Sequence, residues 1–286
     1  MIFLLLSMLT NAALYWLFKY FEKIEARIFE TIVFNYVVAF GCGIFLVPDL
    51  KLAVESSLTF PVWSIAGIAM GALFISVFYF MAITARKAGI AMATLSSKMS
   101  LVLGVVLFSL VGKGDLTWIT ILALVIAMAG LYFFSVDGRT RFKWNMLTYP
   151  ILLLLGSTAV DFSIAFFQGF TANDNERALF TCMPFFGAGF IGLVILAYGL
   201  IAKKKPFPKK ELLTGIVLGL VNYGSIFFLI ELYSSGWLPE HVILPVNNLG
   251  VLIISALGAL WLFSEKLNRR KIQGLILCVL ALILLL

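Results

Sequence analysis

The segment GIAMATLSSKMSLVLGVVLFSLV, residues 89–111, places one lysine in the middle of a long apolar run. About 20 apolar residues suffice for a transmembrane helix. A cation at mid-membrane costs roughly 2.5–3.5 kcal/mol on insertion scales, so it usually faces the protein interior or a wet cavity. Thr94, Ser97 and Ser100 lie near Lys98 and make one side of this helix small and polar. We therefore predict that the rest of the chain encloses Lys98.

The composition is typical of a multi-pass helical membrane protein. Of the 286 residues, 62% are hydrophobic and 12% are charged, whereas a soluble domain carries about 25% charged residues. The first apolar run has neither a basic n-region nor a small-residue cleavage site, which argues against a secretory signal peptide. Cys42, Cys182 and Cys278 lie inside apolar segments without CxxC spacing. They predict no disulfide and no metal site.

Hydropathy and helix-breaking residues predict an all-α protein of ten transmembrane helices. The predicted spans cover approximately residues 2–20, 28–47, 61–84, 89–111, 116–136, 146–170, 177–202, 211–233, 240–263 and 270–286. Pro, Gly and charged residues separate them. We expect a multi-pass protein of the bacterial inner membrane, with the lipid bilayer as its surroundings.

The ten spans divide into two predicted five-helix repeats, residues 1–138 and 142–286. Arg27-Ile-Phe-Glu-Thr31 opens the second span, and Arg177-Ala-Leu-Phe-Thr181 opens the seventh. Gly89 stands at the start of the fourth span and Gly236 before the ninth. Internal repeats matter for function because many transporters build their binding site at the repeat interface.

The distribution of basic residues predicts that the second repeat is inverted in the membrane. The connections after spans 1, 3, 7 and 9 are basic: Lys19, Lys23, Arg27, Arg86, Lys87, Lys203, Lys204, Lys205, Lys209, Lys210, Lys266, Arg269, Arg270 and Lys271. Those after spans 2, 4, 6 and 8 carry Lys51, Lys113 and Arg177. The positive-inside rule then places the odd connections in the cytoplasm and both termini outside. It also explains the net charge of +7 without a nucleic-acid partner.

The region of the ninth and tenth spans carries a family likeness. It contains Pro245-Val-Asn-Asn-Leu-Gly250, then Leu262-Phe-Ser-Glu265-Lys-Leu-Asn268, then Gly274. With these features the chain resembles the drug/metabolite transporter superfamily, specifically its EamA-type ten-helix transporters, over nearly its whole length. Lys98 occupies the approximate position of Pro245 in the first half. The resemblance implies a central cavity lined by helices 1, 3, 4, 6, 8 and 9, and export of small polar or amphipathic solutes.

The intramembrane polar residues are the candidate substrate-binding residues. Asp161 lies mid-way along the sixth span, with Ser157 on the same helix face, and is the expected counter-ion of Lys98. Two interpretations stay open: a static buried pair, or groups that contact substrate or exchange a proton. Asn247 and Asn248 follow Pro245, which frees a backbone carbonyl within its helix. Weaker candidates are Asn222, Tyr223, Asn11, Tyr15 and Tyr79.

These features predict a secondary transporter, not an enzyme, that works by alternating access. A transport ATPase is excluded for this chain because it has no Walker loop. The alternatives are an intramembrane lipid-modifying enzyme, which would need clustered acids or a nucleophile beside a base, and a non-transporting membrane protein. The expected partners are a small-molecule substrate, such as an amino acid, and protons as a candidate coupling ion. We expect a monomer or homodimer without a cofactor.

Overall fold

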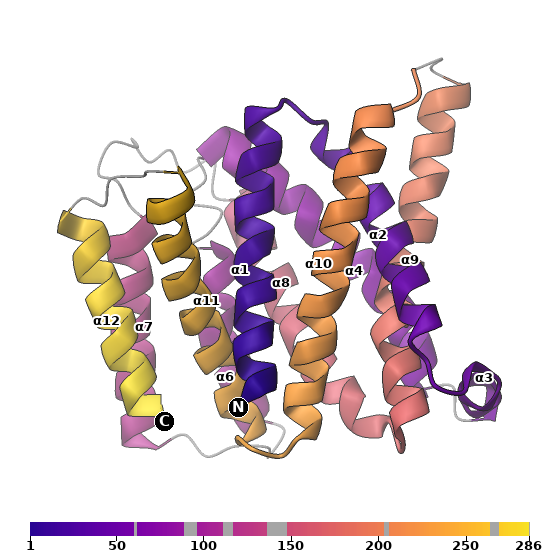
Figure 1. Cartoon of the computed structure of the whole chain (residues 1–286). Coiled ribbons are helices and arrows are strands. Elements are labelled where there is room, and N and C mark those ends of the chain that lie inside the picture. The colour runs from indigo at the N-terminus through magenta and orange to yellow at the C-terminus, as the bar shows by residue number, and fades with distance from the viewer. Residues whose placement is uncertain are drawn as a thin grey trace. The chain divides into compact units, whose positions relative to one another are not determined.

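Every regular element in the described part of the chain is a helix. The computed structural model describes residues 1–59, 62–88, 96–110, 117–135, 148–202, 206–263 and 269–285. The helices are α1 (Ile2–Lys23), α2 (Ile28–Phe45), α3 (Leu50–Thr59), α4 (Val62–Ala88), α6 (Ser100–Leu110), α7 (Trp118–Ser135), α8 (Thr148–Phe167), α9 (Asp174–Ile201), α10 (Lys209–Ser234), α11 (Glu240–Phe263) and α12 (Arg269–Leu285), with a 3-10 turn at Gln168–Phe170 (Figure 1).

Five of these helices are long and apolar enough to cross a membrane. The qualifying segments are Ile28–Phe45, Val62–Met81, Thr148–Phe170, Asp174–Ile201 and Lys209–Ser234. Shorter apolar helices cover Ile2–Phe18, Trp118–Gly130, Val242–Ser255 and Ile272–Ala281. The expectation of a helical, membrane-associated protein is therefore confirmed, and ten spans stay a prediction.

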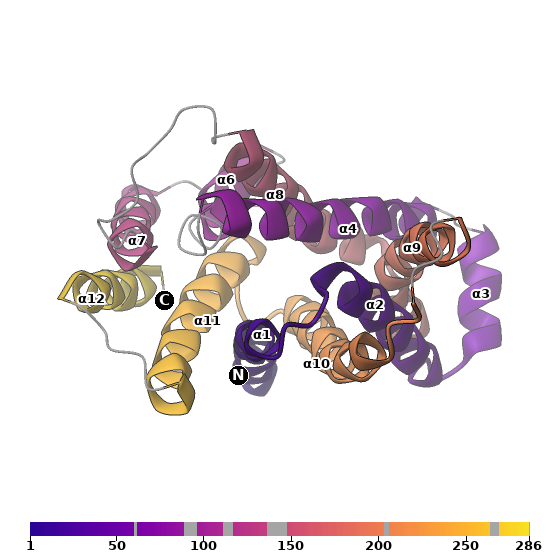
Figure 2. The same ribbon diagram turned by 90° about the horizontal axis from the view of Figure 1, so that it is seen from above.

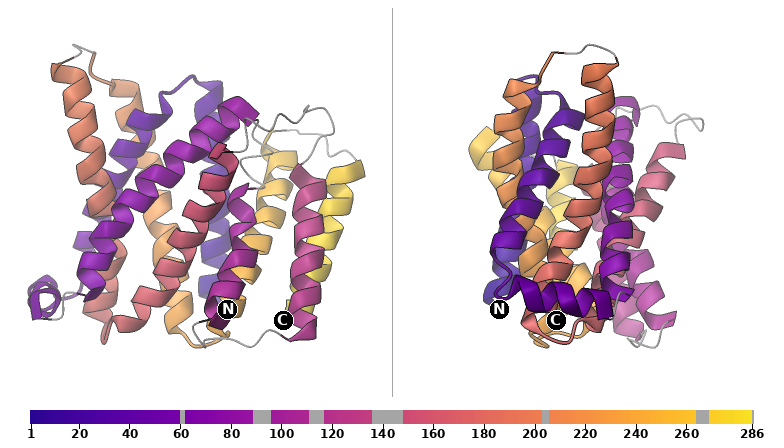
Figure 3. Two further views of the ribbon diagram at one scale, coloured as in Figure 1. Left: turned by 180° about the vertical axis from the view of Figure 1, so that it is seen from behind. Right: turned by 90° about the vertical axis from the view of Figure 1, so that its right-hand side faces the viewer.

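One helix was not expected. We predicted a loop between the second and third spans, but α3 occupies this stretch and runs crosswise to α2 (Figure 3). Asp49 precedes it and accepts a hydrogen bond from the backbone N–H of Leu52 at 3.0 Å. Such a side-chain acceptor satisfies one of the N–H groups that a helix start leaves without a partner.

Packing divides the chain into two compact units, each built from both halves of the sequence. The first unit contains residue 1, residues 77–162 and residues 235–286, and the second contains residues 2–76 and 163–234. The predicted division into two sequential repeats, 1–138 and 142–286, concerns the similarity of the two halves of the sequence and not their packing. It stays a prediction.

In the second unit, α2 lies between α9 and α10, and α1 runs antiparallel to α10 (Figure 1). Glycines allow these helices to approach closely. Gly219 of α10 packs against the backbone carbonyl of Asn35 and the side chain of Val38 on α2. Gly71 of α4 packs directly on Gly187 of α9. Small residues are common at such contacts because they let helix backbones come together within a membrane.

In the first unit, α7 packs along α12, and α6 packs against α11. Figures 1 and 2 show α7 and α12 side by side and running in opposite directions. The helices α6 and α11 are also antiparallel. Both pairs join a helix from the first half of the sequence with one from the second half.

Candidate functional site

Lys98 lies at an interruption of its helix. Residues 96–98 are helical, Met99 is a turn, and α6 begins at Ser100. The sequence predicted a helix running through this point from residue 89, and residues 89–95 lie outside the described ranges. The Lys98 residue is buried, with 8% of its surface exposed. In membrane transporters, discontinuous helices expose polar backbone groups at the substrate site.

Three elements of the first unit bring polar side chains together around Lys98. Lys98 Nζ donates to Asn248 Oδ1 of α11 at 3.2 Å. Ser100 Oγ donates to Asp161 Oδ2 of α8 at 2.8 Å. The Asp161 carboxylate also interacts electrostatically with Lys98 and lies beside the amide of Asn248. One α8 turn earlier, the Ser157 hydroxyl bonds that of Ser97 at 3.3 Å. We call these residues the Lys98 cluster: Ser97, Lys98, Ser100, Ser157, Asp161 and Asn248.

The two asparagines of α11 have unsatisfied polar atoms. Asn247 Oδ1 and Asn248 Nδ2 are buried and have no hydrogen-bond partner among the described residues. The two residues are 3% and 8% exposed. An unsatisfied buried polar group costs about 1–3 kcal/mol. Pro245 precedes them inside α11, and its missing N–H leaves the carbonyl four residues earlier without its helical donor. Polar groups of this kind favour a ligand or water as partner.

The remaining predicted site residues lie elsewhere. Thr94 is outside the described residues. Tyr79 is on α4 and is 55% exposed. Asn11 and Tyr15 are on α1 of the second unit, where Asn11 Nδ2 donates to the carbonyl of Ser7 at 2.9 Å within its own helix. Tyr15 is half-buried.

Asn222 and Tyr223 lie on α10 of the second unit. Asn222 Nδ2 donates to Asn35 Oδ1 of α2 at 3.1 Å. The Tyr223 ring packs against Phe185 and Phe227, at centroid distances of 6.2 and 5.9 Å. The sequence analysis missed Asn35, which is fully buried. Its signal was an amide inside an apolar run, but the sequence does not say that this run packs against α10.

The start of α2 carries a second polar group in the same unit. Arg27 forms ion pairs with Glu30 at 3.2 Å and with Glu211 of α10 at 3.3 Å. The hydrogen bonds that Arg27 donates to Glu211 raise the pKa of the Arg27 guanidinium above its ordinary value. The pairing with Glu211, like that of Asn35, requires knowledge of which helices are neighbours.

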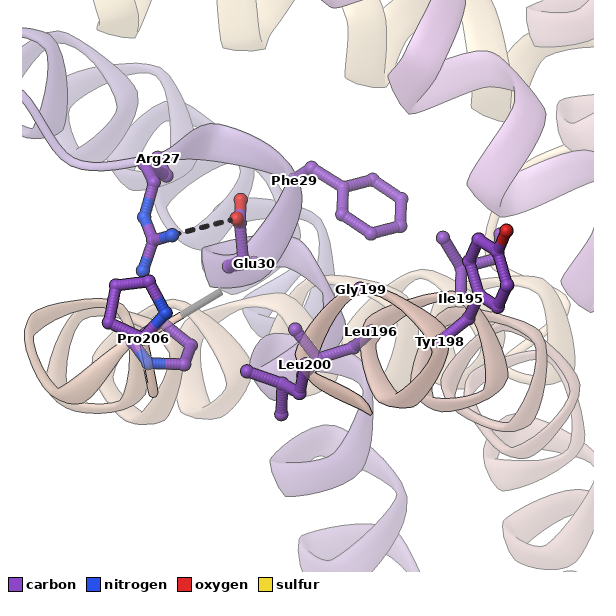
Figure 4. Close-up of a pocket in the computed structure, with 10 residues that line it drawn as sticks. Arg27, Phe29, Glu30, Ile195, Leu196, Tyr198, Gly199, Leu200 and Pro206 are labelled. Carbon is purple, nitrogen blue, oxygen red and sulfur yellow. Dashed lines mark ion pairs between the residues drawn. The ribbon is translucent and has the colours of Figure 1, made fainter. Parts of the chain in front are cut away.

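Beside Arg27 lies a cavity of about 130 Å³ (Figure 4). It is lined by Arg27, Phe29, Glu30, Ile195, Leu196, Tyr198, Gly199, Leu200, Pro206 and Pro208. Figure 4 shows Arg27 facing Glu30, so the cation at this cavity is already neutralised by carboxylates. The Lys98 cluster, with its unsatisfied amide, is the stronger candidate for a ligand site.

Comparison with known proteins supports the fold and assigns no function. No family model matches the chain. A Haemophilus influenzae protein, described as an uncharacterized protein, is 25% identical over 282 residues, which cover 96% of this chain and 93% of the relative. A solved structure, described only as the crystal structure of a protein, has a TM-score of 0.72 at 13% identity, with 99% of this chain and 94% of that chain covered. At this identity the structural likeness concerns the fold alone.

Proposed function

We propose that this chain is a secondary transporter of a small polar or amphipathic metabolite, such as an amino acid, with the Lys98 cluster as its substrate site. One observation carries the proposal. Apolar helices bury a cation and a carboxylate beside an unsatisfied amide and a helix interruption. Ionisable groups inside a membrane are costly and usually mark a substrate or ion pathway. Export, as in the EamA-type transporters that the sequence resembles, is part of the proposal.

The inverted repeat of ten spans is part of the same proposal, and helix pairing supports it. The antiparallel pairs α2 and α9, α6 and α11, and α7 and α12 each join spans that are equivalent under a five-plus-five division. Equivalent helices that pack side by side in opposite directions are the expected result of two repeats related by an axis in the membrane plane.

Glycine spacing gives an independent line of support within the second unit. Gly67 and Gly71 on α4 face α9, and Gly215 and Gly219 on α10 face α2. In each helix the two glycines are one turn apart, which makes a small-residue face for close packing. Because α4 and α10 are the third and eighth spans, the two contacts are equivalent under the proposed repeat. Lys98 and Asn248, which bond each other, are 150 positions apart, as are Arg27 and Arg177.

A charge-neutralisation experiment tests the role of the Lys98 cluster. Lys98→Met, Asp161→Leu and the double variant are compared for melting temperature and for solute uptake into proteoliposomes. Each single change leaves one buried charge uncompensated, at a cost of several kcal/mol, while the double change leaves none. We expect the double variant to recover the melting temperature and to fail in transport. Lys51→Met is the control, because the Lys51 side chain is 87% exposed.

Full transport by a well-folded double variant would contradict the substrate role of Lys98. The cluster would then be a structural ion pair. A wild-type protein that folds in liposomes and moves none of a panel of amino acids, nucleosides and phosphorylated metabolites would contradict the transporter itself.

A further inference from the structure

The Lys98 cluster is electrically neutral before any solute arrives. Its charged members are one ammonium, on Lys98, and one carboxylate, on Asp161. The other members are hydroxyls and an amide. A net charge buried among apolar helices is expensive, so the cluster resists the addition of a single uncompensated charge. This constraint bears on what the site can bind, given the transport function proposed above.

The hydrogen-bonding groups of the cluster suit an anionic oxygen ligand. Asn248 uses its Oδ1 to accept from Lys98, so the Nδ2 donor on the same amide points to the other side. That Nδ2 has no partner in the described part of the chain. The Asp161 carboxylate lies beside this amide and interacts with it. The Lys98 ammonium, which Asn248 Oδ1 holds in place, and the Asn248 Nδ2–H group form a pair of donors. A carboxylate can accept hydrogen bonds from both.

The unsatisfied acceptor of Asn247 does not belong to this pair. Consecutive residues of a helix point in directions about 100° apart and do not face each other. Asn247 Oδ1 is therefore directed away from the donors that Asn248 and Lys98 present. The groups left to meet a ligand beside Lys98 are therefore the ammonium and the Asn248 amide N–H, which favour an anion over a cation.

Asp161 stands in the way of such an anion, because it already interacts with Lys98 and the Asn248 amide. A ligand carboxylate at this place would bring two negative charges beside one positive charge. Protonation of Asp161 removes this repulsion, frees the donors for the ligand and restores neutrality. We propose that the Lys98 cluster binds the carboxylate of a small monocarboxylic acid together with one proton, which Asp161 accepts.

The proton balance is simple. One ligand carboxylate and one proton enter together, the proton forms an O–H bond on the Asp161 carboxylate, and no other bond changes. Among the described residues, the group that faces Asp161 with a charge is Lys98, from the segment before α6. The neutral groups that face it are Ser100 from α6 and Asn248 from α11.

The test uses three solutes with the same isobutyl group and different charges. They are 4-methylpentanoate, leucine and 3-methylbutylamine, titrated calorimetrically into the purified full-length protein in detergent. Comparing buffers with different ionisation enthalpies gives the number of protons taken up. We expect 4-methylpentanoate to bind with uptake of about one proton, and its affinity to fall about tenfold for each pH unit on the alkaline side.

Variants connect that proton to Asp161. Asp161→Asn should still bind 4-methylpentanoate, with no proton uptake and little pH dependence, because the amide is permanently neutral. Glu55→Gln, which neutralises an exposed carboxylate outside the cluster, should keep the wild-type proton count. The melting temperature of each variant is measured alongside, so that a misfolded variant is not read as a loss of binding.

Three results would overturn the inference. The first is binding of 4-methylpentanoate without proton uptake, and the second is proton uptake that persists in folded Asp161→Asn. The third is a failure of 4-methylpentanoate to bind best, either because leucine or 3-methylbutylamine binds more tightly or because none of the three binds. The measurement needs no flux. Proton-linked binding by a protein that transports nothing contradicts the proposed function alone, and transport of another solute without carboxylate binding contradicts this inference alone.

Discussion

At the scale of single residues, burial decides which ion pair matters. Arg27 and Glu211 join α2 to α10, and the Glu211 side chain is 7% exposed. Lys51 and Glu55 form a 4.0 Å pair on α3, with side chains 87% and 61% exposed. Exposed pairs contribute little because water screens the charges and holding two long side chains costs entropy. A buried carboxylate that loses its partner keeps an uncompensated charge, because little water reaches it to screen that charge.

We predict that Arg27→Gln lowers the stability of the protein by about 1–2 kcal/mol, because Glu211 loses a charge-assisted hydrogen bond. The estimate is modest because the Arg27 side chain is itself 40% exposed and partly screened. Lys51→Gln is the matched control and should leave the melting temperature unchanged. Equal melting temperatures for the two variants would show that the Arg27 pair contributes nothing measurable.

At the scale of helices, backbone proximity sets the tolerance to added volume. A Cβ atom at Gly71 of α4 would meet the backbone of Gly187 and the amide nitrogen of Ala188 on α9. Backbone atoms of a helix cannot rotate away as a side chain does. At Gly41 of α2 an added Cβ meets nothing within 4 Å.

Gly71→Ala should therefore destabilise the protein by about 1–3 kcal/mol, the usual cost of overpacking. Gly41→Ala should be neutral or stabilising by up to about 1 kcal/mol, because alanine loses less backbone entropy in a helix than glycine. Thermal unfolding of the two variants in the same detergent measures both effects. A Gly71→Ala protein as stable as Gly41→Ala would mean that α4 and α9 do not pack through this glycine.

At the scale of the whole molecule, basic residues predict the orientation in the membrane. The connections after the odd-numbered predicted spans are basic, and among them Lys209 and Lys210 begin α10. The connection that contains α3 carries Lys51. A bias of this kind normally marks the cytoplasmic side.

Cysteine labelling in intact cells tests this orientation. Lys209→Cys and Glu55→Cys are placed in a protein whose native cysteines, Cys42, Cys182 and Cys278, are replaced by alanine. A membrane-impermeant reagent should label Glu55→Cys before lysis and Lys209→Cys only after it. The reverse pattern would place the termini in the cytoplasm.

The sequence by itself determined the class of protein, because apolar runs of bilayer length are a local property that no fold is needed to recognise. It also located Lys98 and Asp161, since a charge inside such a run is visible without coordinates. Only the tertiary structure decided the partners: Asn248 for Lys98, Ser100 for Asp161, and Asn35 for Asn222. Which apolar helices pack together depends on close steric fit along their faces. Hydropathy is similar in the five helices that are long and apolar enough to cross a membrane, so it does not distinguish one neighbour from another.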